Sequence, residues 1–303
     1  PRDPGPGPAP GKEPAQILNE IASGKTSMKR GQAPASSDHC PEGHILKGVR
    51  VLDLTRMVAG PCCTRILADF GAEVVKVQTE KMATEADRND TPYFRAWNRN
   101  KRSVSLNLDL PEARECFLKL VGDSHIVVEN FSPRVMANWR LQYDRLTTAN
   151  PSLIMLSLSA MGQTGPWKDY VGFGPTFHAF SGLSAASTDA PGYPPVHIGH
   201  AYGDILAGLY GALAILAALR WKEKTGTGRH IDLSGYEAVC TFLGPALMRI
   251  HSTKPSEPED CRTPPHEEEV PDQCYPCSGD DRWCAVTVRA SQWDTFCTIV
   301  DDP

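Results

Sequence analysis

Short apolar runs rich in Val, Ile and Leu alternate with longer amphipathic stretches through the middle of the chain. The runs predict buried strands at Val49 to Leu54, Glu73 to Gln78, Ser103 to Leu108, His125 to Glu129, Leu153 to Ser157 and Arg229 to Leu233. The stretches between them predict helices that begin at Gly60-Pro61, Pro111, Pro133 and Tyr236, and a helical stretch that ends near Ser187. This alternation is typical of an α/β fold, with a parallel sheet and helices on both of its faces.

The first strand–helix–strand unit, with its helix between Gly60-Pro61 and Gly71, resembles the start of a dinucleotide-binding domain. Gly60 and Gly71 alone do not make the glycine fingerprint, so NAD or FAD binding is not supported. Loops after the strands of such sheets bind ligands, which points to Arg56 to Gly60, Asn130 to Ser132 and Ser159 to Gly165. Asn130 suits a simple turn equally well.

A long apolar helix is predicted within the stretch from Gly199 to His230. Its apolar run, Ile205 to Leu219, is rich in Ala and Gly and short for a membrane span, so we expect a helix buried on all sides. Asp204 lies just ahead of that run. A carboxylate there can cap the helix by accepting its unpaired N–H groups. The same position would also keep a carboxylate ionised and able to act as a nucleophile.

The flanking segments differ in composition from this α/β core. Residues 1–43 are rich in Pro, Gly and Ser and predict a disordered lead or linker ahead of a large domain at 44–252. An acidic, Pro-rich linker is predicted at 253–272. Residues 273–303, with a hairpin around Gly279-Asp280 and a helix near Ser291, predict the start of a smaller α+β domain that stops early. The chain is therefore expected to be part of a longer one.

Composition narrows the class of protein. A net charge of −5 with scattered Lys and Arg argues against a nucleic-acid or anionic-membrane surface. No basic region precedes an apolar one at the start, and the ten cysteines suit free thiols, so we expect a cytoplasmic protein. Cys62 and Cys63 are expected in the core. Among Cys261, Cys274, Cys277 and Cys284 the spacing lacks a second Cys or His pair, so no metal site is expected.

Two histidines, His197 and His200, follow a Pro-rich loop that would bring them toward Asp204. Each could act as a base or as a structural hydrogen-bond donor. The structural role is favoured, because no Ser or Cys nucleophile lies beside them.

Several motifs in one order resemble those of class III CoA-transferases (the CaiB/BaiF type), which include formyl-CoA and carnitine-CoA transferases. They are "GVRVLDLTRMVAGP", "FGAEVVKV", "NRNKRSVSLNL", "VVENFSPRVM", "LSLSAMGQTGP", "GDILAGLYGALAILAAL" and "TGTGRHIDLSGYEAV". The resemblance implies a large Rossmann-like domain, a small domain and an interlocked homodimer in the full-length form. It further implies an acyl-CoA thioester and a small carboxylic acid as substrates, with no tightly bound cofactor.

The resemblance assigns Asp204 of the Gly203-Asp204 pair as the catalytic nucleophile, which would form an acyl anhydride and then an aspartyl-CoA thioester. It implies CoA contacts at Val58 and Ala59 after the first strand and at Leu106. Further contacts are implied at an Asn-Phe pair and the next residue, which are Asn130, Phe131 and Ser132. The glycine-rich loop of the oxalate-using members is not seen, so an oxalate or formate substrate is not expected.

Two alternatives remain at this point. An α-methylacyl-CoA racemase has the same fold, but Phe173 stands where the racemase histidine would lie, and phenylalanine cannot exchange a proton. The chain could instead be a non-catalytic CoA-binding half of a two-domain protein.

Overall fold

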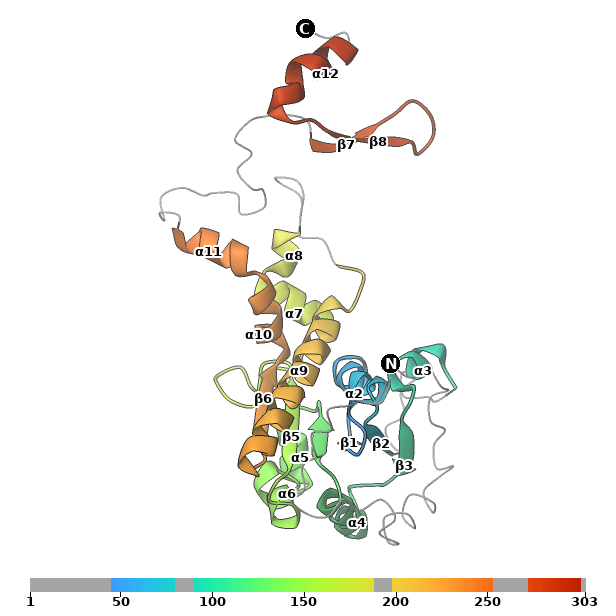
Figure 1. The fold of residues 1–303 in the computed structure, drawn as a ribbon, viewed down its shortest axis with the longest axis vertical. Helices are drawn as coiled ribbons and strands as arrows, with labels where there is room; N and C mark the ends of the chain where they lie inside the picture. The colour runs from blue at the N-terminus through green and yellow to red at the C-terminus, as the bar shows by residue number, and fades with distance from the viewer. Residues whose placement is uncertain (1–44, 80–89, 188–197, 253–271, 301–303) are drawn as a thin grey trace.

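The computed structural model describes residues 45–79, 90–187, 198–252 and 272–300 (Figure 1). Its centre is a six-stranded sheet, and every neighbouring pair of its strands is parallel. The strands are β1 (Arg50–Asp53), β2 (Glu73–Gln78), β3 (Arg102–Ser105), β4 (Ile126–Glu129), β5 (Ile154–Ser159) and β6 (His230–Ser234). Their order, β3-β2-β1-β4-β5-β6, is that of a doubly wound nucleotide-binding sheet. The predicted Rossmann-like sheet is confirmed.

The predicted strands match the observed ones to within a few residues. β2 begins and ends where predicted, at Glu73 and Gln78. β3 ends at Ser105 rather than Leu108, because it is an edge strand whose pairing with β2 stops at the Gln78–Ser105 pair. The next residue, Leu106, still donates its N–H to the Gln78 carbonyl oxygen at 2.8 Å before the chain leaves the sheet.

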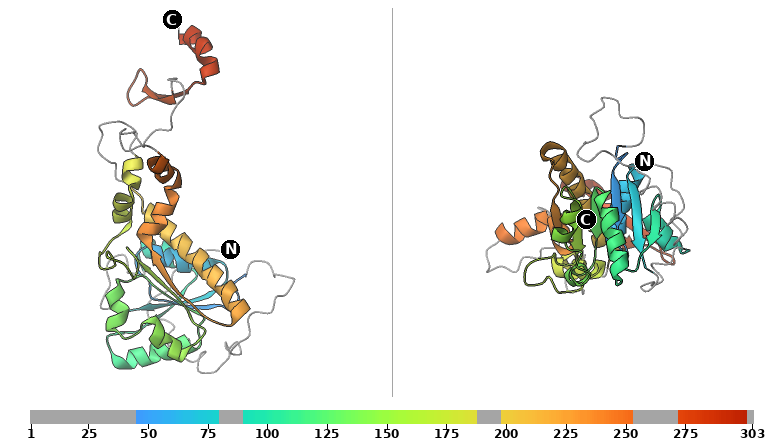
Figure 2. Two further views of the ribbon diagram at one scale, coloured as in Figure 1. Left: turned by 90° about the vertical axis from the view of Figure 1, so that its left-hand side faces the viewer. Right: turned by 90° about the horizontal axis from the view of Figure 1, so that it is seen from below.

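Helices cover both faces of the sheet (Figure 2). Because strand side chains alternate between faces, Val51 of β1 joins one buried cluster and Leu52 joins the other. The first cluster packs under α2 (Ala59–Asp69), α9 (Tyr202–Thr225) and α10 (Gly235–Phe242). The second packs under α4 (Pro111–Gly122), α5 (Pro133–Asn138) and α6 (Tyr143–Ala149). The predicted burial of Cys62 and Cys63 is confirmed, with exposed fractions of 1% and 0%.

Three features of the helices differ from expectation. The sequence did not predict α3 (Pro92–Asn98) or α6, which are each two turns long and carry little apolar periodicity. The helical stretch that ends near Ser187 is two helices, α7 (Gly174–Ser181) and α8 (Leu183–Ala186). The single helix predicted from Tyr236 to Met248 is also two, α10 and α11 (Gly244–Ser252). Pro245 explains that break, since it lacks the N–H that would continue the ladder.

The prediction that the long apolar helix is buried on all sides is wrong. Leu209, Leu213 and Leu216 of α9 are 51%, 61% and 41% exposed and form one stripe along the helix. The small residues on the opposite side of α9 pack against α2 and the sheet. In the described part of the chain α9 alone is long and apolar enough to cross a membrane by length and composition, a test that core helices of soluble proteins also pass.

The C-terminal part of the chain forms a hairpin followed by a helix. β7 (Asp272–Pro276) and β8 (Trp283–Thr287) pair antiparallel, and a short 3₁₀ turn at Ala290–Gln292 leads into α12 (Trp293–Val300). The hairpin and helix predicted there are both present, whereas the four predicted domain boundaries stay predictions. Cys274, Cys277 and Cys284 are exposed free thiols, and Cys261 lies outside the described residues. Within the described ranges no group of three His, Cys, Asp or Glu side chains is arranged to hold a metal.

A fully buried ionic cluster fixes the turn between β1 and α2. Lys101 Nζ donates to Asp53 Oδ2 at 2.9 Å, to Thr64 Oγ1 at 2.8 Å and to the Pro61 carbonyl oxygen at 3.2 Å. Burial alone would raise the pKa of Asp53, but Lys101 and Lys76 hold it well below its usual range. The cluster therefore ties the end of β1 to the first turn of α2 by hydrogen bonds that exclude water.

We expect Lys101→Met to lower the free energy of unfolding by about 3–5 kcal/mol, because it leaves the Asp53 charge buried without its main partner. Arg220→Met is the matched control: Arg220 pairs with Glu223 but its side chain is 70% exposed, so its loss costs less than about 1 kcal/mol. Urea denaturation of both variants measures the difference. Equal losses in the two variants would contradict a structural role for the cluster.

Candidate active site

The N-terminus of α9 lies at the edge of the sheet where ligands bind in this type of fold. β6 follows α9 and is parallel to β5, so α9 has to run back from the carboxyl edge of the sheet to its amino edge. Its first residues therefore lie beside the loops that follow the strands, and the course of α9 beside β5 and β6 can be followed in Figure 1. Asp204 is in that first turn.

The interpretation of Asp204 as the helix cap is wrong. The N-cap position of α9 is occupied by Ala201, and Asp204 is the third residue of the helix. Its carboxylate points instead toward α7, where Oδ2 accepts a hydrogen bond from the Gly174 N–H at 3.0 Å. The bond links two helices that are thirty residues apart in sequence.

The surroundings of Asp204 raise the pKa of its carboxyl group, but not far enough to keep it protonated at neutral pH. Burial raises the pKa of the carboxyl from 3.8 to about 6, and the Gly174 hydrogen bond opposes that rise. The unpaired N–H groups of the first turn of α9 add a favourable potential. At neutral pH the carboxylate is therefore mostly ionised yet poorly solvated, which is the state in which it can attack an acyl carbon.

Two glycines allow this close arrangement. A Cβ at position 174 would overlap Oδ2 of Asp204, so a glycine is required for the carboxylate to lie against α7. One turn beyond Asp204, a Cβ at Gly208 would lie 2.7 Å from the Ala59 carbonyl oxygen and 2.8 Å from Cys62 Cβ. The first turn of α2 is thus packed directly against the helix that carries Asp204.

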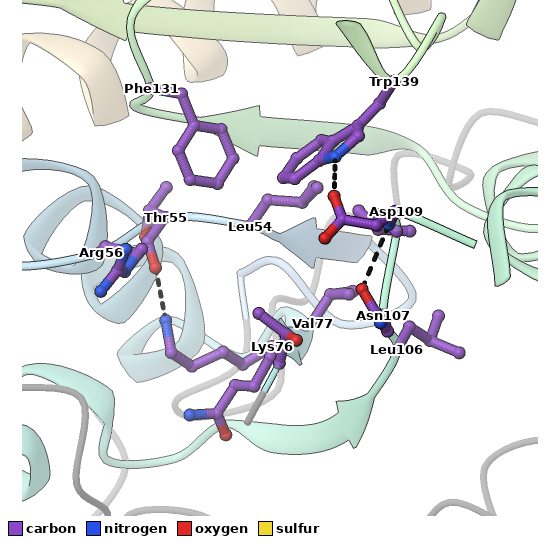
Figure 3. A pocket seen from close by; sticks show the side chains of 13 residues that line it. Leu54, Thr55, Arg56, Lys76, Val77, Leu106, Asn107, Asp109, Phe131 and Trp139 are labelled. Atoms are coloured by element: carbon purple, nitrogen blue, oxygen red, sulfur yellow. Dashed lines mark hydrogen bonds between the residues drawn. The ribbon is translucent and has the colours of Figure 1, made fainter. Parts of the chain in front are cut away.

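A cavity lies at the carboxyl ends of β1, β2 and β3, bounded by the loop after β4 (Figure 3). Phe131 and Trp139 form one wall, with their rings edge to face at 5.4 Å. Lys76 lies on the opposite side and donates to the Thr55 carbonyl oxygen at 2.6 Å. The residues that line the cavity are Leu54, Thr55, Arg56, Lys76, Val77, Gln78, Thr79, Leu106, Asn107, Leu108, Asp109, Phe131 and Trp139. The aromatic wall suits a flat ligand.

The residues that the family resemblance assigned to CoA lie around this cavity in different ways. Leu106 and Phe131 line it. Val58 and Ala59 are buried where α2 begins, and Ser132 is the N-cap residue of α5. Asn130 joins the loop after β4 to the loop after β1: its Oδ1 accepts from the Arg56 N–H at 2.7 Å and its Nδ2 donates to the Arg56 carbonyl oxygen at 2.8 Å. Their contacts with CoA stay predictions.

The sequence analysis missed a buried carboxyl at the end of β4. Glu129 is 2% exposed and accepts a hydrogen bond from the Phe131 N–H at 2.8 Å. Burial raises its pKa to about 7, against an opposing hydrogen bond from Ser157. The Glu129 carboxyl group holds the loop that carries Phe131. The sequence signal for a buried carboxyl was the position of Glu129 at the end of an apolar run.

The histidines differ in their relation to Asp204. His197 lies outside the described residues, and His200 is exposed, so the roles of both stay open. His178 was not expected near Asp204, yet it is buried and its Nε2 accepts the Gly203 N–H at 2.9 Å. Phe173, at the position of the racemase histidine, is 59% exposed next to Gly174. Neither Gly174 nor His178 carried a sequence signal beyond the Gly-Pro pair that begins α7.

Comparison with curated proteins finds CoA-transferases. The succinyl-CoA–L-malate CoA-transferase alpha subunit of Chloroflexus aurantiacus is 44% identical over 209 residues, which are 65% of this chain and 48% of that protein. The succinyl-CoA–D-citramalate CoA-transferase of the same species is 34% identical over 252 residues, 81% of this chain and 62% of that protein. The succinate–glutarate CoA-transferase of Agrobacterium fabrum is 35% identical over 202 residues, 62% and 50% of the two chains. The chain spans about half the length of the curated relatives it matches.

Solved structures and a family model agree with these relatives. A CAIB/BAIF family protein from Brucella suis superposes with a TM-score of 0.74 at 28% identity, over 86% of this chain and 70% of that one. A hypothetical protein from Mycobacterium tuberculosis gives a TM-score of 0.68 at 28% identity over the same shares. The family model described as CoA-transferase family III matches residues 46–303, so it covers the sheet, the Gly203-Asp204 pair and the C-terminal hairpin alike. With fold, relatives and motif order in agreement, the chain belongs to CoA-transferase family III.

Proposed function

We propose that the protein to which this chain belongs transfers coenzyme A from an acyl-CoA thioester to a carboxylic acid, with Asp204 as the nucleophile. The observation that carries the proposal is the state of that carboxylate. It is partly buried, its pKa is raised to about 6, and a backbone N–H of another helix holds it beside the first turn of α2. Because the family consists of CoA-transferases, the reaction we propose for this carboxylate is attack on the carbonyl carbon of an acyl-CoA thioester.

The steps balance without an added acid, base or oxidant. One Asp204 oxygen attacks the thioester carbonyl carbon, the C–S bond breaks, and CoA leaves as the thiolate with Asp204 held in an acyl anhydride. The thiolate attacks the Asp204 carbonyl carbon and expels the donor acid as a carboxylate, which leaves an Asp204–CoA thioester. The acceptor carboxylate then takes the place of the donor, and the same two steps run in reverse.

The long CoA molecule would bridge two places on the carboxyl edge of the sheet. Its nucleotide would occupy the cavity walled by Phe131 and Trp139, with Leu106 beneath it. Because Val58 and Ala59 are buried, CoA would meet the backbone of the first turn of α2 rather than their side chains. The thioester end would then reach Asp204 on the far side of that turn. CoA would be a substrate, and no tightly bound cofactor takes part in these steps.

For the acids we propose a short dicarboxylic acid and its CoA thioester. Relatives in the family are named for succinyl-CoA with L-malate, D-citramalate or mesaconate, and for succinate with glutarate. The matched region includes the sheet edge and the Asp204 helix, so succinyl-CoA with this set of acceptors is the first panel to test. The full-length protein would carry out this reaction in the cytoplasm.

Removal of the nucleophile tests the reaction. We expect Asp204→Asn to lower kcat for CoA transfer from succinyl-CoA by at least about 1,000-fold, because an amide cannot form the anhydride. Wild-type protein given succinyl-CoA without an acceptor and then hydroxylamine should carry a modification on Asp204, detected by peptide mass spectrometry. An active Asp204→Asn protein would refute the assignment. Exchange of an α-proton in a 2-methylacyl-CoA without an acceptor would favour the racemase alternative.

The raised pKa of Asp204 predicts a stability cost that depends on pH. The folded protein binds the Asp204 proton more tightly than the unfolded chain does, so stability is lost as pH rises from about 4 through about 6. We expect Asp204→Asn, which mimics the protonated acid, to raise the free energy of unfolding by up to about 3 kcal/mol at pH 8. At pH 4 the gain should vanish. Urea denaturation at both pH values measures it, with the exposed Asp144→Asn as a control that shows no such trend.

The exposed leucine stripe on α9 supports the further proposal of a homodimer. Leu209, Leu213 and Leu216 form an apolar surface of the kind that a protein interface covers. We expect Leu213→Asp to convert the full-length dimer to a monomer in light scattering, since a charge would be buried without a partner. The control is Leu110→Asp, at a similarly exposed leucine ahead of α4, which should leave the dimer intact. A wild-type monomer would contradict the proposal.

A further inference from the structure

One face of α7 holds the Gly203-Asp204 pair at two points. Gly174, the first residue of α7, donates its N–H to Asp204 Oδ2 at 3.0 Å. His178, four residues later, accepts the Gly203 N–H on its Nε2 at 2.9 Å. Residues four apart lie on the same side of a helix, so both bonds come from the same face of α7. They act on successive residues of α9 and run in opposite directions.

The Gly203 N–H belongs to the part of α9 that has no partner within the helix. The first four N–H groups of a helix lack an intrahelical acceptor, and a side chain at the N-cap position usually satisfies one of them. Here the N-cap residue is Ala201, which offers no side-chain acceptor. Gly203 is buried, and His178 is only 1% exposed. The imidazole of His178, which belongs to α7, therefore accepts the N–H bond that an N-cap side chain would normally accept.

Packing fixes the imidazole in this place. A Cβ at position 203 would lie 3.2 Å from His178 Nε2, 3.2 Å from Phe177 Cδ2 and 3.2 Å from Val239 Cγ2. Glycine thus lets α7 and α10 approach the start of α9 closely. Phe177 and Val239 belong to the buried cluster that joins these helices. The ring has little room to turn away from the Gly203 N–H.

The hydrogen bond also fixes the chemical state of the ring. Nε2 accepts, so it carries a lone pair, and the proton of the neutral imidazole is on Nδ1. Nε2 is occupied by the backbone, so that nitrogen is not available to move a proton to or from a substrate.

We propose that His178 is a positioning residue for the nucleophile: it fixes the backbone of Gly203 and thereby the direction in which the Asp204 carboxylate points. The proposal rests on the proposed function of Asp204. The bond to His178 fixes the peptide unit between Tyr202 and Gly203, directly before Asp204, while Gly174 fixes the carboxylate itself. An error of about 1 Å in the position of a reacting group costs up to about 100-fold in rate, so loss of one anchor is expected to reduce kcat without preventing CoA binding.

Three variants of the full-length protein test this inference. His178→Gln places an amide oxygen near the position of Nε2 and keeps an acceptor, whereas His178→Leu fills similar volume without one. Ser181→Ala is the matched control, because the two hydrogen bonds that Ser181 Oγ makes within the described residues lie near the end of α7, to the His178 carbonyl oxygen and from the Leu183 N–H. Steady-state kinetics with succinyl-CoA and an acceptor acid give kcat and KM. Hydrogen exchange of peptides containing the Gly203 amide reports the bond independently of activity.

We expect His178→Leu to lower kcat by about 10- to 100-fold with KM for succinyl-CoA within about 3-fold of wild type. Exchange at the Gly203 amide should rise in the same variant. His178→Gln should restore both values to within about 3-fold of wild type, and Ser181→Ala should change neither. If His178→Leu does not fold, Gly203→Ala serves instead, since its methyl group displaces the imidazole by a few tenths of an ångström.

Two results would overturn the proposal: an unchanged kcat in His178→Leu, or equal losses in the Leu and Gln variants, which would mean that the ring only fills space. Failure of the proposed function is a separate outcome. It would be seen as no transfer by the wild type, or as transfer by Asp204→Asn. In either case the hydrogen exchange of the Gly203 amide would still show whether the bond between His178 and Gly203 forms.

Discussion

The direction of β6 is the constraint on which the site depends. Because β6 pairs parallel with β5, the helix before it has to return across the sheet, which leaves the first turn of α9 at the carboxyl edge. That edge also carries the loops after β1 and β4 and the cavity beside them. A carboxylate in the first turn of α9 is therefore close to the loops of the doubly wound sheet, whichever residues fill the rest of the helix.

Two aspartates near α2, Asp53 and Asp204, differ in the direction of their pKa shifts because their neighbours differ. Asp53 is fully buried, but Lys101, Lys76 and Thr55 hold its pKa well below the usual range, and its oxygens are occupied by hydrogen bonds. Asp204 is less buried, yet its pKa rises to about 6, because a backbone N–H opposes the cost of burial only in part. The first carboxylate joins β1 to α2, whereas the second keeps a poorly compensated charge, which is the state that the proposed nucleophile needs.

Close backbone approach, rather than a cluster of charged side chains, builds the surroundings of Asp204. Gly174, Gly203 and Gly208 let α7, α10 and α2 lie against the start of α9 with no Cβ between them. The Gly174 N–H bonds to the carboxylate and carries no full charge, so the carboxylate is held without being neutralised. The aromatic-walled cavity lies at the same carboxyl edge of the sheet as the first turn of α9.

The sequence by itself determined the parallel sheet, all six of whose strands begin within one residue of the predicted position, because apolar periodicity is a local property. Motif order also pointed to Asp204, whose role as the nucleophile stays a prediction. It failed where the outcome depended on contacts between distant segments. The cap interpretation of Asp204 and the full burial of α9 were both wrong, since each depends on which helix lies opposite. Only the tertiary structure brought Gly174 and His178 to the Gly203-Asp204 pair, because those hydrogen bonds join residues 30 and 25 positions apart.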